Sequence, residues 1–457
     1  MKRINIILTA VFFCIGMTFL PAALWAEEPD SSGFGDDSFS SDEEGFGGFG
    51  DFEGFGNAAQ SPLTVSGEFL FQTRYTVDDD AVGESPVQTF PELILGLGYA
   101  GEYSDLRANL QLNRNNLAED VRDVMDEAYI RLYYGRVNLE AGYMKVVWGN
   151  GDETHVLDVI NPMDYSDFVN PDYIDRKEAE TMVKLNVYPS ETGLLELVYE
   201  PVFTPDTIPL TGRWRPAYMR SLETLGINPQ NALVYPDTST LDYGQTGVRY
   251  TTSLGGFDLG GLYYYGYLRE PAADVSGILT TGLVNVSYDR MHLFGLEGAK
   301  VLAGFNNRAE LGFYLTEDTG GDDPAVHNGR FVYLVGSDRD TGLGNLNVNV
   351  QVQGQVIVKK DGITPFDIEY DGDDEYTRTM LILGLTDSFR NEKIKPEIGF
   401  TTTLEKGDWF VRPKVDFGLR DDAVLSVNCT LFGGGSETTF GQYDNNDFVQ
   451  VSFLYSF

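Results

Sequence analysis

The sequence predicts an all-β protein: an antiparallel transmembrane β-barrel that follows an export signal and a disordered tail. Three observations predict this class. One long run alternates strictly between polar and apolar residues, the amino end has the composition of a cleaved signal, and alternating runs recur up to a terminal aromatic residue. An exported protein that forms a closed barrel, with an apolar outer face and a polar interior, accounts for all three.

The clearest strand is 345–358, which reads N-L-N-V-N-V-Q-V-Q-G-Q-V-I-V. Side chains alternate between the two faces of a strand, so the Asn and Gln residues share one face. The other face carries Leu346, Val348, Val350, Val352, Gly354, Val356 and Val358. Strands of soluble proteins usually have about five or six residues. A tilted strand that crosses a bilayer needs about ten, apolar outward and polar inward, so this run favours a membrane barrel.

The amino end predicts export. Lys2 and Arg3 precede an apolar run, 4–20, and small residues follow it. This order of a basic, an apolar and a small-residue region is typical of a secretory signal peptide. We expect cleavage after Ala26, so that 1–26 is removed.

Residues 27–60 form a separate segment. Phenylalanines are scattered among Gly, Ser, Asp and Glu, with no Lys or Arg. Such a segment buries too little apolar area to offset its ordering entropy, so we expect disorder on the periplasmic side. It is either a plain linker or a tether that contacts a periplasmic partner. The barrel then occupies 61–457.

Composition excludes several classes. A formal net charge of −38 excludes a nucleic-acid binder, because phosphates would be repelled. After cleavage only Cys429 remains, so neither an internal disulfide nor a cysteine metal cluster forms. We expect no cofactor and no metal. No set of nucleophile, base and orienting residue emerges, so an enzyme is not predicted.

Alternating runs fill the rest of the chain. Outside 345–358 they begin near Leu63, Leu93, Leu106, Glu127, Val137, Thr181, Gly193, Gln245, Phe257, Gly282, Asn307, Arg330, Thr377, Lys395, Trp409, Ala423 and Asp447. One predicted hairpin places Ala128, Ile130, Leu132 and Tyr134 against Val137, Leu139, Ala141 and Tyr143 across a turn at Gly135 and Arg136. At about 25 residues per strand with its loops, we expect about sixteen strands, in a range of about 14 to 18.

Connections alternate between short and long. The long ones are 149–178, 201–244, 361–375 and 433–446. Bacterial barrels place short turns in the periplasm and long loops outside, which is the arrangement expected here.

The last strand resembles a known assembly signal. Asp447 to Phe457 reads D-F-V-Q-V-S-F-L-Y-S-F. The residues on its outward face are Val449, Val451, Phe453, Tyr455 and Phe457. This looks like the closing strand by which the barrel-assembly machinery recognises outer-membrane proteins of diderm bacteria. The resemblance implies that location, with membrane lipid and the assembly machinery as partners.

A second resemblance covers about forty residues from Glu127. The motif combines Trp148-Gly149 with V-L-D-V-I-N-P-M-D at 156–164, which contains Asp158, Asn161, Pro162 and Asp164. It is similar to a family of outer-membrane barrels of unknown function. The resemblance implies a porin-like channel.

The loop 150–178 is the first candidate site. It is rich in carboxylates, and Asn-Pro turns at Asn161 and Asn170 restrict its backbone. If it folds into the lumen, Asp158, Asn161 and Asp164 lie at a constriction and set a negative field. The alternative, an external cap with solvated acids, stays open.

Inward basic residues are the second candidate. Arg412 and Lys414 share the inward face of their strand, and Arg107 and Arg131 do so on theirs. Together they would make a basic wall opposite the acidic loop and select permeants by charge. The alternative is that they pair with inward acids across strands.

The predicted function is passive diffusion of small hydrophilic solutes, with a preference for cations. Two other classes stay open: a structural or adhesive barrel whose long loops bind partners, and a barrel enzyme. A homo-oligomer stays open as well.

Overall fold

The computed structural model describes residues 62–77, 85–118, 124–152, 154–167, 173–224, 226–274, 278–365 and 367–457. The predicted signal peptide, the predicted disordered segment and Asn170 lie outside these residues.

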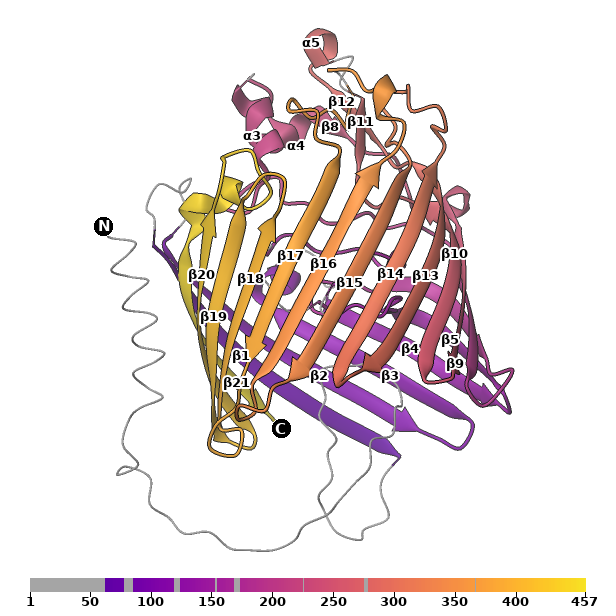
Figure 1. The fold of residues 1–457 in the computed structure, drawn as a ribbon, viewed down its shortest axis with the longest axis vertical. Helices are drawn as coiled ribbons and strands as arrows, with labels where there is room; N and C mark the ends of the chain where they lie inside the picture. Colours follow the sequence, from indigo (N-terminus) through magenta and orange to yellow (C-terminus); the bar gives the residue numbers. More distant parts are fainter. Residues whose placement is uncertain are drawn as a thin grey trace, which may run out of the picture.

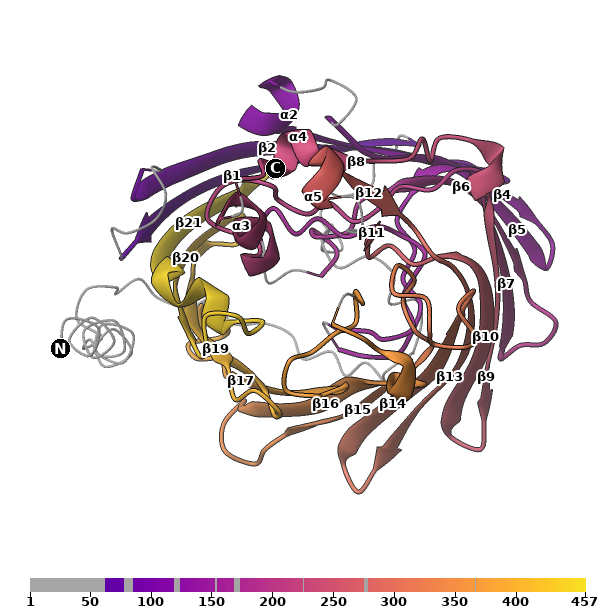
Figure 2. The ribbon, with the colours of Figure 1, turned by 90° about the horizontal axis from the view of Figure 1, so that it is seen from above.

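Eighteen antiparallel strands form one sheet that closes on itself, seen as a tilted wall in Figure 1 and as a ring in Figure 2. They are β1 (Leu63–Thr76), β2 (Val87–Ala100), β3 (Ser104–Asn113), β4 (Met125–Tyr134), β5 (Val137–Met144), β6 (Glu180–Val187), β7 (Gly193–Glu200), β9 (Gln245–Leu254), β10 (Phe257–Tyr267), β13 (Arg290–Leu302), β14 (Phe305–Thr316), β15 (Arg330–Asp340), β16 (Asn347–Ile357), β17 (Thr377–Thr386), β18 (Ile394–Thr403), β19 (Trp409–Arg420), β20 (Ala423–Gly433) and β21 (Phe448–Ser456). Each pairs with the next barrel strand along the chain, and β1 also pairs with β21, which closes the ring.

The predicted all-β architecture, a closed antiparallel barrel, is confirmed. Its eighteen strands are the upper limit of the predicted range of about 14 to 18 and exceed the expected number of about sixteen. Some strands are shorter than expected: β5, β6 and β7 have eight residues each. Turns are also tight, since β4 ends at Tyr134 and β5 begins at Val137. Each strand with its connection therefore uses fewer residues than assumed, and two further strands fit the chain.

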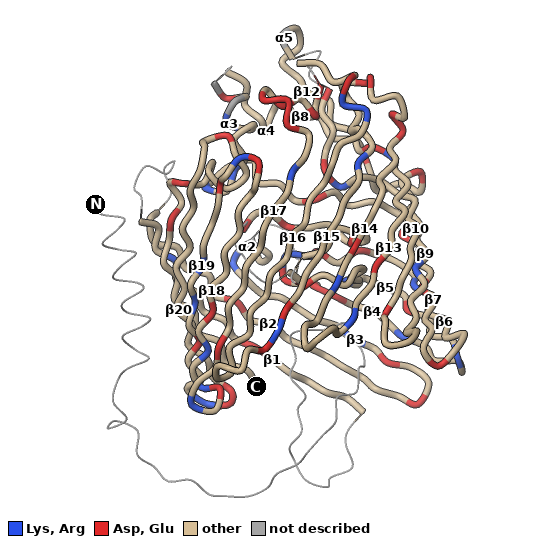
Figure 3. Tube along the Cα trace, viewed as in Figure 1, with Lys and Arg blue, Asp and Glu red and all other residues tan. Residues whose placement is uncertain are grey.

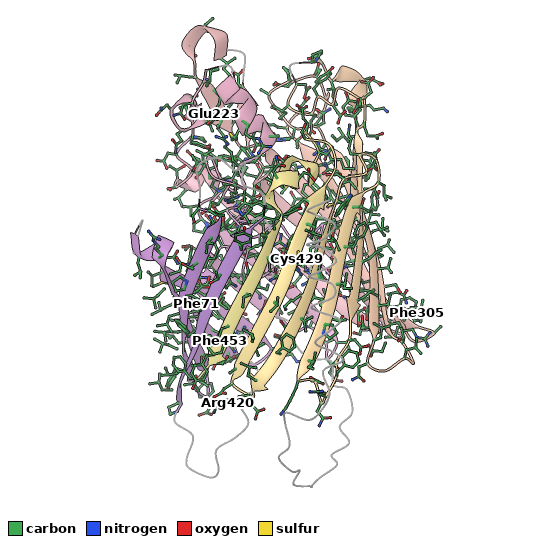
Figure 4. The ribbon with its side chains drawn as sticks, turned by 90° about the vertical axis from the view of Figure 1, so that its left-hand side faces the viewer. Phe71, Glu223, Phe305, Arg420, Cys429 and Phe453 are labelled. Atoms are coloured by element: carbon green, nitrogen blue, oxygen red, sulfur yellow. The ribbon has the colours of Figure 1, made fainter. Side chains whose placement is uncertain are left out.

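The alternation sets the two faces of the wall. On β16, Val350 and Val356 are each 38% exposed on the outer face, whereas the inward Gln351 is 2% exposed. Phe71 and Phe453 are register partners on neighbouring strands and lie side by side on the outer face (Figure 4). The predicted hairpin of β4 and β5 is confirmed residue for residue, from Ala128 opposite Tyr143 to Tyr134 opposite Val137.

The two ends of the barrel differ. Short turns and the chain's carboxyl end lie at one end, and the long loops lie at the other (Figure 1). Charged residues gather in the loops and turns and recur along the strands (Figure 3). The long-loop end carries α3 (Ala217–Thr224), α4 (Pro229–Ala232), α5 (Ile278–Thr281) and a small sheet of β8 (Leu233–Val234), β11 (Ala272–Asp274) and β12 (Val284–Ser287).

The run predicted near Gly282 therefore divides. Its first part, β12, pairs with β11 and β8 among the long loops, and the barrel strand begins only at Arg290. A short α2 (Arg114–Ala118) follows β3, and 3-10 turns occupy Leu241–Tyr243, Lys360–Gly362 and Gly441–Asn446. No helix in the described ranges is long and apolar enough to cross a membrane.

The closing strand has the predicted faces. Val451, Tyr455 and Phe457 are 44%, 38% and 54% exposed on the outer side. Phe457 and Gly67 exchange backbone hydrogen bonds of 2.8 and 2.9 Å. The Phe457 ring lies over Gly67, where an added Cβ would come within 2.3 Å of it, so the absence of a side chain there accommodates the ring. A role in assembly stays a prediction.

Candidate functional site

The loop between β5 and β6 lies inside the barrel. Its residues Trp148, Leu157 and Ile160 are fully buried. Its hydrogen bonds reach inward side chains of β14 and β16, and β14 is six places from β5 around the ring. Figure 2 shows chain crossing the interior of the ring. Of the two arrangements that the sequence left open, the structure has the inward one.

Glu310 on β14 is the main polar anchor. Its Oε1 accepts the backbone N–H groups of Asn150 and Gly151, both at 2.7 Å. Its Oε2 accepts those of Val156 and Leu157, at 2.8 and 3.2 Å. A carboxylate only accepts, and hydrogen bonds to a charged acceptor are the stronger kind. The buried Glu310 thus satisfies four backbone donors that would otherwise lose their water partners.

Glycines on the wall make room for the apolar anchors. Leu157 packs against Gly295 and Gly312, which are register partners on β13 and β14. A Cβ on either would come within 2.9 Å of the Leu157 side chain. Gly247 on β9 does the same for Trp148, whose ring would lie 2.6 Å from an added Cβ. Such close packing excludes water and fixes the loop's position.

The amide face of β16 holds the tip of the loop. Gln351 accepts the Asp152 N–H at 3.1 Å and donates to the Asp152 carbonyl at 2.6 Å. Gln353 accepts the Thr154 hydroxyl at 2.5 Å, and Asn349 donates to the Asp152 carboxylate. The amides that identified this strand in the sequence therefore bind the loop.

Asp158 and Asn161, two predicted constriction residues, bond within the loop. The Asp158 side chain is fully buried, forms an ion pair with Lys177 and accepts the Tyr173 hydroxyl at 2.7 Å. Burial lowers the pKa of Lys177, and Asp158 opposes that change. Asn161, only 3% exposed, accepts the Val146 N–H at 2.7 Å and donates to the carbonyls of Met144 and Glu178.

The third predicted loop residue, Asp164, is half-buried. Its carboxylate accepts the Ser166 N–H at 2.7 Å, and its backbone forms a bridge with Thr207 of the next long loop. The two long loops therefore support each other inside the barrel.

The predicted inward basic residues have acidic neighbours. Arg412 lies 3.2 Å from Glu397 on the neighbouring strand β18, and Lys414 lies 3.9 Å from the same carboxylate. Arg131 pairs with Glu140 at 3.2 Å. These are the cross-strand pairs of the alternative interpretation.

The structure also separates the predicted basic residues. Arg107 on β3 is the register partner of Tyr129 on β4, and Arg131 on β4 is the partner of Asp105, so the two arginines lie two residues apart on paired strands. Arg107 acts electrostatically on Glu127 and Tyr129. Arg412 and Lys414 lie on β19, far from these two strands around the ring. They do not form one wall.

A cavity of about 810 Å³ lies between the loops and the wall. Its charged lining includes several residues that the sequence reasoning missed, among them Asp206, Arg269, Glu270, Arg330 and Arg378. Arg330 and Arg378 sit at inward positions of their strands, so alternation could have identified them. The other three lie in long loops, for which no periodic pattern exists.

Arg269 ties the long loops to the wall. Its guanidinium bonds the Val159 carbonyl at 3.1 Å and the carboxylates of Glu180 and Glu200 at 2.8 and 3.0 Å. A buried guanidinium needs such partners because an unpaired buried charge is costly. Arg269 therefore links the inward loop to β6 and β7 through Glu180 and Glu200.

Two carboxylates in the cavity titrate differently. Burial raises the pKa of Asp206 to about 6, although the Met163 N–H, at 2.8 Å, and Arg269 act in the other direction. Burial also acts to raise the pKa of Glu270, but Arg330 and its basic neighbours outweigh this and lower it to about 2. Glu270 is charged at neutral pH, and Asp206 changes charge near pH 6.

No model of a known protein family matches the chain, and no curated protein matches its sequence. The family resemblance of 127–164 stays a prediction. Among solved structures, the chain is similar to a triple mutant of the Rhodopseudomonas blastica porin, with 11% identity, a TM-score of 0.42 and coverage of 86% of this chain and 100% of that one. It is also similar to OccK11 (OpdR) of Pseudomonas aeruginosa, with 10% identity, a TM-score of 0.46 and coverage of 86% and 95%. We therefore argue function from this chain's own residues.

Proposed function

We propose that the protein is a porin-like channel of the outer membrane, through which small hydrophilic solutes diffuse passively. The observation that carries this proposal is the combination of a closed barrel, apolar outside, with a loop fastened inside it beside a polar cavity of about 810 Å³. An apolar outer band and a polar interior suit a bilayer-spanning channel. A loop that is fastened inside the barrel narrows the passage without closing it.

A preference for cations is the finer part of the proposal. Seven carboxylates line the cavity against four Lys or Arg side chains. Charge that lines a narrow passage raises the local concentration of ions of opposite sign. Asp158 contributes little to this field because Lys177 neutralises it. The carboxylates that supply the preference are those of the cavity wall and rim, such as Asp206 and Glu405.

Conductance decides between a channel and an adhesive or structural barrel. The purified protein, inserted in a planar bilayer, should give discrete conductance steps, whereas a barrel closed by its loops gives none. Reversal potentials across a potassium chloride gradient then measure selectivity. The cation preference should weaken with salt, because the screening length falls from about 30 Å at 0.01 M to about 3 Å at 1 M. Steps with anion selectivity would retain the channel and refute the cation preference.

A further inference from the structure

The outer face of the barrel carries an apolar groove. It has a volume of about 510 Å³ and lies over β9, β10, β13, β14 and β15. Its lining consists of Val248, Tyr250, Gly261, Leu262, Tyr263, Phe294, Gly295, Leu296, Leu311, Gly312, Phe313 and Phe331. This volume is within the range of about 300–1,000 Å³ that is typical of small-ligand sites.

Register explains the groove. Tyr263, Phe294, Phe313 and Phe331 are successive register partners, so their rings form one row across four strands. In the next row toward the short turns, Gly261 is the partner of both Tyr250 and Leu296 and leaves a gap between them. The surrounding side chains are open to the exterior: Phe294 is 50% exposed, Leu296 is 64% exposed and Leu311 is 51% exposed.

The side chains of His292 and Arg290 extend from the groove along β13. On β13 the outward residues that follow Phe294 toward the long loops are His292 and Arg290. At about 3.4 Å per residue, Arg290 lies about 14 Å from Phe294 along the strand. His292 Nδ1 lies 2.8 Å from the Tyr263 hydroxyl, at the edge of the groove.

The Arg290 guanidinium packs against two tyrosine rings at the long-loop end of β10. Its centre lies 4.8 Å from the ring centre of Tyr265 and 4.2 Å from that of Tyr267, and it donates to the Asp242 carbonyl at 2.7 Å. Among the described residues no carboxylate forms an ion pair with it, although the Glu317 carboxylate accepts the backbone N–H of Arg290 and interacts with its charge. Aromatic belts mark the boundary between hydrocarbon and head groups, where lipid phosphates lie.

We propose that this site binds a phosphorylated lipid, with the phosphate at Arg290 and His292 and one acyl chain in the groove. The proposal rests on the membrane location proposed above and is independent of channel activity. A cation in line with an apolar groove matches a lipid, whose phosphate and chain are arranged in the same order. A second copy of the chain matches the site less well, because its apolar outer face would not place an anionic group beside Arg290 and an apolar chain in the groove.

Native mass spectrometry of the detergent-purified protein tests this, with dioleoylphosphatidic acid as the probe. The protein should retain one phosphatidic acid, and Arg290→Gln should weaken its binding about tenfold, the loss expected of one charge-assisted contact. Dioleoylglycerol has the same chains and no phosphate. It should bind weakly to the wild type and equally weakly to Arg290→Gln. Soluble glycerol phosphate should not compete. Competition by glycerol phosphate would indicate a phosphate site without a chain site and would overturn the proposal.

Gly261→Leu tests the groove. An added Cβ there meets only Leu296, at 3.6 Å, and the backbone of Gly295, so the variant should fold while its side chain fills the gap. It should weaken phosphatidic acid binding. Gly298→Leu is the matched control, since Gly298 is also outward, has similar space for a Cβ and lies outside the groove.

Equal binding by both glycine variants and the wild type would refute the chain site. If Gly261→Leu instead separates an oligomer into single chains and leaves lipid binding unchanged, the groove is a subunit interface and the proposal is wrong. Heat-modifiable migration on gels confirms that each variant is folded. Because binding is read without any conductance measurement, failure here leaves the channel proposal untouched.

Discussion

Replacing Glu310 by Gln should release the inner loop. Gln has nearly the volume of Glu but offers one acceptor oxygen where Glu310 offers two, and each of those oxygens accepts two backbone N–H groups of the loop. In either orientation of the amide, two buried donors face an NH₂ group. An unsatisfied buried donor costs about 1–3 kcal/mol, so docking of the loop should weaken by about 2–6 kcal/mol.

Trypsin cleavage measures this release. The loop contains Arg176 and Lys177, and the buried Lys177 is 2% exposed while the loop is docked. Cleavage of a transiently open segment follows the population of the open form when closing is fast. A loss of 2 kcal/mol corresponds to about 30-fold more open form, so cleavage in Glu310→Gln should accelerate at least that much. Single-channel conductance should rise as well, because the released loop no longer narrows the passage.

Glu297→Gln is the control. Glu297 is the register partner of Glu310 on the neighbouring strand and is similarly buried, but its carboxylate binds Arg249 on the wall, at 2.6 Å. Its replacement should leave the cleavage rate of the loop unchanged. Cleavage of Glu310→Gln at the wild-type rate would refute the role of Glu310 as an anchor, and equal acceleration in both variants would indicate general loosening of the barrel.

Three further outcomes are expected. Because the pKa of Asp206 is about 6, its carboxylate is charged at pH 7 and largely neutral at pH 5. The cation preference measured by reversal potentials should therefore fall between pH 7 and pH 5. In Asp206→Asn this dependence on pH should be absent. Asp158→Asn leaves the ammonium of Lys177 buried without a counter-ion, which should cost about 3–5 kcal/mol; an unchanged thermal midpoint would contradict this. Val451→Asp places a carboxylate toward lipid, which costs less than the roughly 2–4 kcal/mol of a midplane Arg or Lys but is still unfavourable, and should lower the folded yield more than Ser452→Asp on the inner face. Equal yields would mean that the faces are assigned wrongly.

Local periodicity explains which parts of the structure could be predicted. The hairpin of β4 and β5 was predicted to the residue because alternation and a two-residue turn fix register together. The docking of the inner loop has no such local signal: Glu310 and Val156 are 154 residues apart in sequence, and Glu310 occupies an ordinary inward position. Inward glycines such as Gly295 and Gly312 were the available clue, since a strand that omits side chains toward the interior leaves space for another segment.

The interior polar residues are distributed according to what each can donate and accept. The Gln351 side chain has both an acceptor and a donor, and it binds both the N–H and the carbonyl of Asp152, as a second backbone would. Glu310 can only accept, and it faces N–H groups alone. Arg269 can only donate, and it faces carbonyls and carboxylates. These polar side chains are therefore specific for one docked path of the loop, because exchanging any two of them would oppose donor to donor or acceptor to acceptor.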